Sequence, residues 1–132
     1  MPVTYTIDKN ERVIRTQCIG MVTLEEVVAH FRELERDPEC RAPLDVLLDL
    51  SRIDSLPSAR EIRAVALELK TIQNVRLDTC AIVAVRDAVF GMLRMFEVMV
   101  QGYFRAIRVF RATAEAEAWL VSQRQHSTQF HF

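Results

Sequence analysis

The sequence predicts an α/β domain with a mixed, mostly parallel five-stranded sheet. Two apolar runs, at 44–50 and 79–85, have the continuous hydrophobicity of strands that are buried on both faces. Segments with apolar side chains at helical spacing lie before, between and after these runs. Strands that alternate with helices favour right-handed crossovers, and therefore parallel pairing with helices over at least part of both faces. The expected order of elements is β-β-α-β-α-β-α-β-α.

The first two strands are expected to form an antiparallel hairpin at one edge of the sheet. Val3, Tyr5 and Ile7 alternate with threonines, which is the pattern of a half-buried strand. A polar turn at 8–11 then leads to a second strand at 13–22.

Capping chemistry marks the start of the first two expected helices. Thr23 and Ser58 each stand three residues before a glutamate, which is the spacing of a capping box. The first helix is expected to stop at Asp37–Pro38, and the second to run over 59–74. The first carries an apolar stripe, Leu24, Val27, Val28, Phe31 and Leu34.

Asp87 is expected to cap a third helix over 88–101, which Gly102 ends. A fifth strand follows at 105–110, and a last helix at 113–123. These elements form one expected domain over residues 1–124, and residues 125–132 are expected to be a loose tail.

Composition and charge exclude several classes of function. The net charge of −1 lacks the basic footprint of a nucleic-acid-binding domain, and no apolar run approaches the ~20 residues of a membrane span. The first twenty residues do not resemble a signal peptide, so a cytoplasmic protein is expected. Three widely separated glycines cannot build a glycine-rich phosphate loop, and no metal or other cofactor is expected. Cys18, Cys40 and Cys80 have no paired spacing and are expected to be reduced thiols, buried in the fold.

Polar side chains gather where the third and fourth expected strands end. In open α/β sheets, ligands bind at this carboxyl edge. No nucleophile, base and orienting group come together there, so no catalytic residue and no enzyme is expected. His30 is expected to be a solvated histidine on the outer face of the first helix. The strand-end residues are Asp49, Ser51, Asp54, Ser55, Ser58, Arg86 and Asp87.

Two helix faces are candidate binding surfaces. The side of the second helix opposite its core stripe carries Arg60, Ala64, Leu67 and Thr71, a partly apolar stripe that suits a partner protein. The third helix is apolar nearly all round, which predicts burial on a second side. Three covers are open for that side: the last helix, a second copy of the chain in a homodimer, or a hydrophobic small molecule. The residues on that side are Phe90, Gly91, Met95 and Val98.

Nearly the whole chain resembles a STAS domain of the SpoIIAA-like (STAS/SEC14-type) group of small bacterial proteins. The resemblance rests on the element order and on three segments, LDVLLDLSRIDSLPS at 44–58, RDAVFGMLRMFE at 86–97 and RVFRATAEAEAWL at 108–120. It implies a SpoIIAA-like fold and a regulatory binding module. Anti-sigma-factor antagonists of this group carry an Asp-Ser-Ser-Gly phosphorylation motif, which falls on Pro57, Ser58, Ala59 and Arg60 here. The phosphoacceptor position is therefore Ala59, and the phospho-loop, which also includes Asp54 and Ser55, is degenerate.

These observations lead to two main functional hypotheses, and an enzyme of unknown type is kept as a third only because strand-end acids and a serine share one edge of the sheet. The first is a non-enzymatic, STAS-like interaction module that engages a protein partner through the loop 53–58 and the second helix. It would work without a serine phosphorylation switch. The alternative is a small domain that binds a hydrophobic or lipid-like ligand in a pocket beside the methionine-rich third helix.

Overall fold

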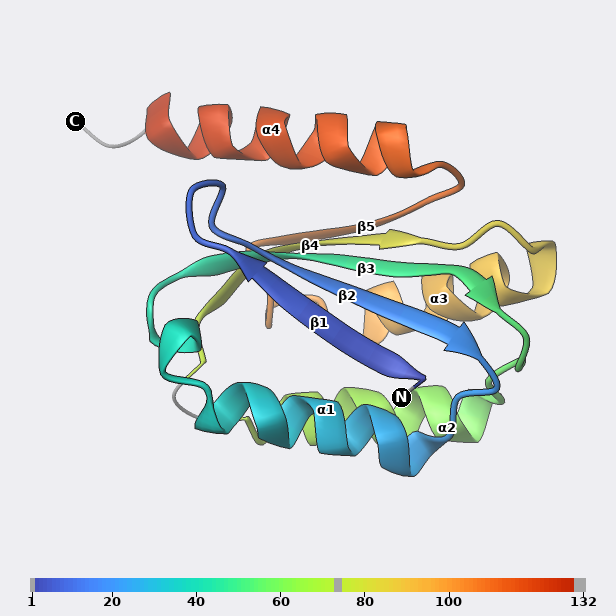
Figure 1. Ribbon diagram of the computed structural model, residues 1–132. Helices are drawn as coiled ribbons and strands as arrows, with labels where there is room; N and C mark the ends of the chain where they lie inside the picture. The colour runs from blue at the N-terminus through green and yellow to red at the C-terminus, as the bar shows by residue number, and fades with distance from the viewer. Residues whose placement is uncertain (1, 73–74, 130–132) are drawn as a thin grey trace.

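The computed structural model describes residues 2–72 and 75–129, and its elements follow the predicted order (Figure 1). The strands are β1 (Val3–Asp8), β2 (Val13–Gly20), β3 (Leu44–Ile53), β4 (Leu77–Val83) and β5 (Ala106–Phe110). The helices are α1 (Leu24–Arg36), the short 3-10 helix η1 (Pro38–Arg41), α2 (Ala59–Leu69), α3 (Asp87–Met99) and α4 (Thr113–Gln129).

The five strands lie in the sheet in the same order as in the chain. β1 pairs with β2 antiparallel, and β2, β3, β4 and β5 pair parallel, as the sequence predicts. Each crossover moves one strand further in the same direction. Because such crossovers are right-handed, α1, α2 and α3 must all lie on one face of the sheet. The other face is covered by α4, as Figure 1 shows.

The sheet therefore has an apolar core on each face. Successive side chains of a strand point to opposite faces, so Leu48 of β3 packs under the three-helix layer while Leu47 packs under α4. Ala116 and Leu120 of α4 are buried against the sheet, with Trp119 packed beside them. The apolar run at 44–50 is thus explained by burial on both sides.

The helix ends match the prediction at two of three caps. Thr23 and Ser58 each form both hydrogen bonds of a capping box. The expected cap at Asp87 is wrong, because Arg86 is the cap residue of α3 and makes no side-chain cap bond. Asp87 instead lies in the first turn, where its carboxylate pairs with Arg111.

Two helices differ in length from the prediction. α2 ends at Leu69, and the hydroxyl of Thr71 donates to the carbonyl of Glu68 just beyond it. Residues 73 and 74, expected at the end of this helix, lie outside the described residues. α4 continues to Gln129, so 125–129 are helical where a loose tail is expected, and 130–132 are not described.

The predicted place of His30 is wrong: its side chain is buried, with 8% of the residue exposed. It lies between α1, β1 and β2, where its ring centroid is 5.3 Å from that of Tyr5 and its Nε2 is 3.3 Å from Thr16 Oγ1. Burial lowers the pKa of His30 from its ordinary 6.5 to about 4, so the ring is neutral at pH 7.

Replacement of Ser58, a confirmed cap, and of Asp87, a cap that was predicted wrongly, should change the free energy of unfolding by different amounts. Ser58→Ala removes a hydrogen-bonded cap and should lower the free energy of unfolding by about 1 kcal/mol. Asp87→Ala removes an exposed ion pair and should change it by less than about 0.5 kcal/mol. Urea denaturation of both variants checks this, and equal losses would contradict the assignment of the caps.

Because His30 is buried, the free energy of unfolding should fall in mild acid. The unfolded chain protonates this ring near pH 6.5 and the folded chain only near 4, so stability falls as the pH decreases between these values. At ~1.36 kcal/mol per pKa unit, the loss from pH 7 to pH 5 is roughly 2 kcal/mol.

The matched variant for this experiment is His30→Gln, which keeps a polar side chain but cannot titrate. Urea denaturation at pH 7 and pH 5 should show a smaller acid loss in the variant than in the wild type. Parallel losses in the two proteins would refute the effect of His30.

Candidate functional site

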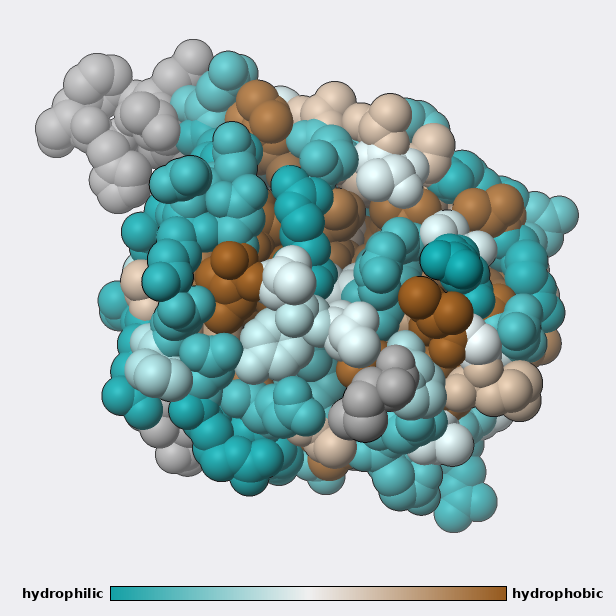
Figure 2. All heavy atoms as spheres, viewed as in Figure 1, coloured by the Kyte–Doolittle hydropathy of each residue, from teal (hydrophilic) through white to brown (hydrophobic). Residues whose placement is uncertain are grey.

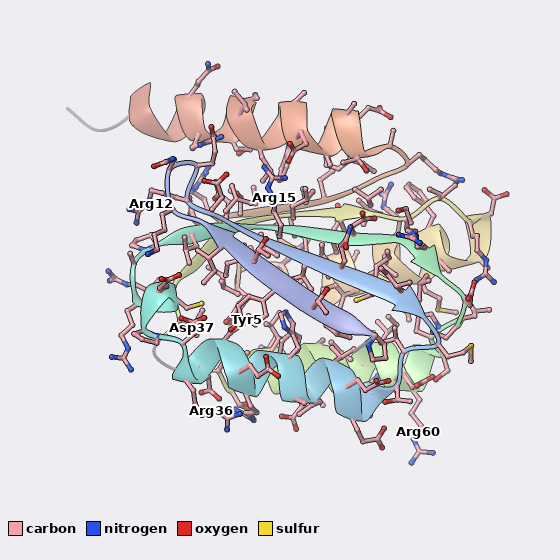
Figure 3. All side chains as sticks on the ribbon, viewed as in Figure 1. Tyr5, Arg12, Arg15, Arg36, Asp37 and Arg60 are labelled. Atoms are coloured by element: carbon pink, nitrogen blue, oxygen red, sulfur yellow. The ribbon has the colours of Figure 1, made fainter. Side chains whose placement is uncertain are left out.

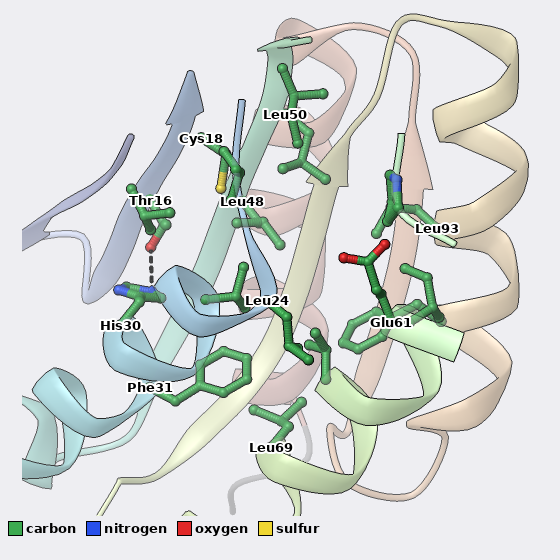
Figure 4. A pocket seen from close by; sticks show the side chains of 18 of the residues that line it. Thr16, Cys18, Leu24, His30, Phe31, Leu48, Leu50, Glu61, Leu69 and Leu93 are labelled. Atoms are coloured by element: carbon green, nitrogen blue, oxygen red, sulfur yellow. Dashed lines mark hydrogen bonds between the residues drawn. The ribbon is translucent and has the colours of Figure 1, made fainter. Parts of the chain in front are cut away.

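A cavity of about 170 Å³ lies between the sheet and the helices α1 and α2 (Figure 4). It begins between the loops at the carboxyl ends of β2 and β3, beside Ser55 and Pro57, and reaches Ile14 and Leu77 near the amino ends of β2 and β4. Along β3 its wall extends from Val46 to Ile53, roughly 23 Å at ~3.3 Å per residue. The cavity is therefore elongated along the strands.

Short side chains on the sheet make room for this cavity. Thr16, Cys18 and Cys80 face the helices, and each is smaller than its partner on the neighbouring strand. These partners are Leu48 for Thr16, Val3 for Cys18 and Val46 for Cys80. Phe31 of α1 and Leu69 of α2 close the opposite wall, as Figure 4 shows. A larger residue at any of the three short positions would fill space that the helices do not reach.

The cavity wall is neutral over most of its area. Burial raises the pKa of Cys18 to about 12 and also raises that of Cys80, so both thiols are protonated at pH 7. All three cysteines are buried and free, as predicted. Glu61 is the one charged side chain among the described residues of the wall, because His30 is neutral.

Two loops form the mouth of the cavity, and Ser55 joins them. Its hydroxyl accepts a hydrogen bond from the backbone N–H of Val22 at 3.1 Å and donates to the carbonyl of the same residue at 3.4 Å. Leu56 is 49% exposed and Met21 is 68% exposed beside these loops. Figure 2 shows hydrophobic atoms on the surface near the carboxyl end of β2, among hydrophilic ones.

The structure brings the degenerate phospho-loop to this mouth. Ser55 and Pro57 line the cavity, and the exposed Asp54 accepts a hydrogen bond from Arg86 through its backbone carbonyl at 3.1 Å. The hydroxyl of Ser58 accepts the N–H of Glu61 at 3.1 Å, so its side chain serves the helix cap. Ala59 is the exposed first residue of α2 and has no hydroxyl to modify.

The outer stripe of α2 lies at the surface. Leu67 is 61% exposed, and Arg60 projects away from the molecule at the start of the helix (Figure 3). Ala64 is half-buried. The hydroxyl of Thr71 is held by Arg32 of α1 at 3.1 Å, in a link between the two helices.

On the predicted outer face of α3, two residues make contacts within the chain and two are exposed. The guanidinium of Arg111 lies over the ring of Phe90, 4.1 Å from its centroid, and Met95 packs against the main core. Gly91 is exposed and Val98 is 65% exposed. The last helix does not cover this face, because α4 lies on the opposite side of the sheet. A homodimer through this face stays a prediction.

The position of the cavity differs from the expected one beside the methionines of α3. That helix contributes Leu93 and Phe96 to the wall, and neither Phe90 nor Met95 lines it. Sequence reasoning also missed His30, although positions 27, 30, 31 and 34 follow the i, i+3, i+4, i+7 spacing of an inward helix face. The missed signal was a histidine on that face above a threonine on the sheet.

Among the residues that the structure describes, no helix combines the length and the hydrophobicity of a transmembrane helix.

Arg15 and Tyr5, which point to opposite faces of the sheet in Figure 3, each bind an acidic side chain. Arg15 pairs with Glu117 of α4, and the hydroxyl of Tyr5 donates to Asp37 at 2.8 Å.

Comparison with known proteins identifies the fold. No family model matches the sequence, and no curated protein matches it. Among solved structures, the chain is similar to an uncharacterised protein of the DUF3478 family with a SpoIIAA-like fold, from Shewanella loihica PV-4. The two are 19% identical with a TM-score of 0.59, over 89% of this chain and 91% of that one. The predicted resemblance is confirmed at the level of structure: the chain has a SpoIIAA-like fold.

Proposed function

We propose that this protein is a cytoplasmic, non-enzymatic binding module that holds a small, mainly apolar molecule between α1, α2 and the sheet. The observation that carries the proposal is the cavity of about 170 Å³ with an almost entirely apolar wall. An engineered apolar cavity of ~150 Å³ is large enough to bind benzene. The alternative function derived from the sequence is therefore supported best, with its pocket moved from α3 to α1 and α2.

The fold supplies a route by which such a ligand could enter. The mouth is formed by two loops, and Ser55 joins them with two hydrogen bonds to one residue of the β2–α1 turn. The N–H of Asp54 also donates to the carbonyl of Gly20 at 2.8 Å, so opening this mouth requires these hydrogen bonds to break together. The degenerate phospho-loop thus acquires a different role in this proposal, as one side of a ligand entrance.

Benzene is a suitable first probe because it is apolar and fits a cavity of this volume. Addition of benzene should shift the amide resonances of residues around the cavity in ¹⁵N-correlated NMR spectra. In Cys18→Leu the larger side chain fills the cavity, and the shifts should disappear while the protein remains folded.

The matched control is Ala118→Leu, which enlarges an exposed side chain on α4. This variant should respond to benzene as the wild type does. An unresponsive wild type, or a Cys18→Leu variant that still responds, would count against the proposed function.

A second candidate function is the binding of a protein partner by the outer stripe of α2. The observation in its favour is Leu67, whose 61% exposed side chain lies in an otherwise partly polar stripe. The two functions are compatible, because this stripe points away from the cavity that the same helix covers.

Leu67→Glu tests this second function, since a buried carboxylate would weaken an apolar contact. Affinity capture from the native host should lose a partner with Leu67→Glu and retain it with Val121→Glu. The control places the same charge at an exposed position of α4. Equal recovery by both variants would remove α2 as the binding surface.

A further inference from the structure

A pair of buried polar side chains lies in the otherwise apolar interior of the cavity. Thr16 is 1% exposed and His30 is 8% exposed, and both line the wall. Their contact of 3.3 Å between Oγ1 and Nε2 is at the long end for a hydrogen bond (Figure 4). Among the described residues, neither side chain makes another hydrogen bond.

Both side chains therefore keep unused capacity for hydrogen bonding. A threonine hydroxyl offers one donor and two acceptor positions, and a neutral imidazole offers one donor and one acceptor. One mutual contact uses only part of this capacity. The pair is not left unsatisfied, because the one buried side-chain nitrogen or oxygen without a hydrogen bond among the described residues is Oε2 of Glu97. What the pair offers inside the cavity is the capacity beyond its mutual contact, and a polar group on a ligand would use it.

The groups around this pair determine which charge such a ligand can carry. From β1, the ring of Tyr5 packs against His30, and the hydroxyl of Tyr5 is already bound to Asp37. Cys18 and its neutral thiol lie two residues along β2 from Thr16, and Asp49 and Glu26 contribute to the raised pKa of that thiol. On α2, the carboxylate of Glu61 lies at the mouth. The interior thus has nearby negative charges.

The described residues of the wall hold no cation at pH 7. His30 is neutral, and neither lysine nor arginine lines the cavity. A buried carboxylate or phosphate would lose its hydration without an opposite charge to replace it, which is strongly unfavourable. A hydroxyl group loses much less and can join the pair with good geometry.

We propose that the Thr16–His30 pair is a specificity site that selects a small apolar ligand with an uncharged hydroxyl group and rejects the corresponding carboxylate. This inference rests on the proposed function and names the class of its ligand. The apolar part lies along the strands, and the hydroxyl bonds with Thr16 and His30 inside the cavity. The ligand class is a short aliphatic or aromatic alcohol.

Two probes with the same chain length test this selectivity in the full-length protein: 1-hexanol and hexanoate. In isothermal titration calorimetry at pH 7, 1-hexanol should bind at least tenfold more tightly. At pH 5 a larger fraction of hexanoate is protonated and uncharged, so its apparent affinity should rise more than tenfold. The affinity of 1-hexanol should stay constant, since His30 remains mostly neutral at that pH.

A variant locates the effect at the polar pair. Thr16→Val has nearly the same shape and removes the hydroxyl, so it should weaken 1-hexanol binding roughly 3- to 10-fold, as expected for one neutral hydrogen bond. Benzene, which has no hydroxyl, should bind this variant at least as well as the wild type. The matched control is Thr6→Val at an exposed position of β1, which should leave both affinities unchanged.

The outcomes separate this inference from the function on which it rests. Binding of benzene together with equal binding of 1-hexanol and hexanoate at pH 7 would overturn the inference and leave the proposed function standing. An unchanged 1-hexanol affinity in a folded Thr16→Val variant would overturn it as well. Failure of benzene, 1-hexanol and hexanoate to bind at either pH would overturn both.

Discussion

The arrangement of the helices depends on the order of the parallel strands in the sheet, where each strand lies next to the one before it in the chain. β2, β3, β4 and β5 follow one another across the sheet in chain order, so right-handed crossovers place α1, α2 and α3 in one layer. Within the described part of the chain, the opposite face is covered by α4, whose Ala116 and Leu120 are buried against the sheet. The cavity follows from this asymmetry, because it lies between the sheet and the three-helix layer.

The space arises from a mismatch between the helix layer and the sheet below it. α1 and α2 are held together at one end, where Arg32 donates to Glu68 at 2.9 Å and to Thr71 at 3.1 Å. Below the helices, Thr16, Cys18 and Cys80 are too short to fill the distance that the larger side chains around them set. Close packing is the rule in protein interiors, so a void of this size that runs along the strands supports the proposal of a bound ligand.

Much of the fold follows from local patterns in the sequence. Alternation predicts β1, the two continuous apolar runs predict β3 and β4, and the capping boxes at Thr23 and Ser58 fix two helix starts within a residue. The expected cap at Asp87 is wrong because an acidic residue suits the first turn of a helix as well as the cap, and Asp87 lies in the first turn, where it pairs with Arg111. α2 ends earlier than predicted, and both the backbone N–H and the hydroxyl of Thr71 bond to the carbonyl of Glu68 there, a local contact that helix propensity does not describe.

The candidate site was less accessible to sequence reasoning, for a physical reason. A cavity forms where side chains from several helices and strands together fail to fill the space between them, so no single segment of the sequence predicts it. The loop 53–58 was identified because strand ends are recognisable, yet Thr16 and His30 were not connected, since fourteen positions separate them in the chain. A buried histidine on the inward stripe of α1 is the part of the site that the sequence could have revealed.

We propose that the ligand lies in this cavity and on no exposed helix face. Nuclear Overhauser effects between 1-hexanol and the protein test it most directly, because they report distances to individual side chains. The account predicts contacts to Phe31, Leu48 and Ile62 inside the cavity. Contacts confined to the exposed side chains of Leu67 or Val98 would contradict it.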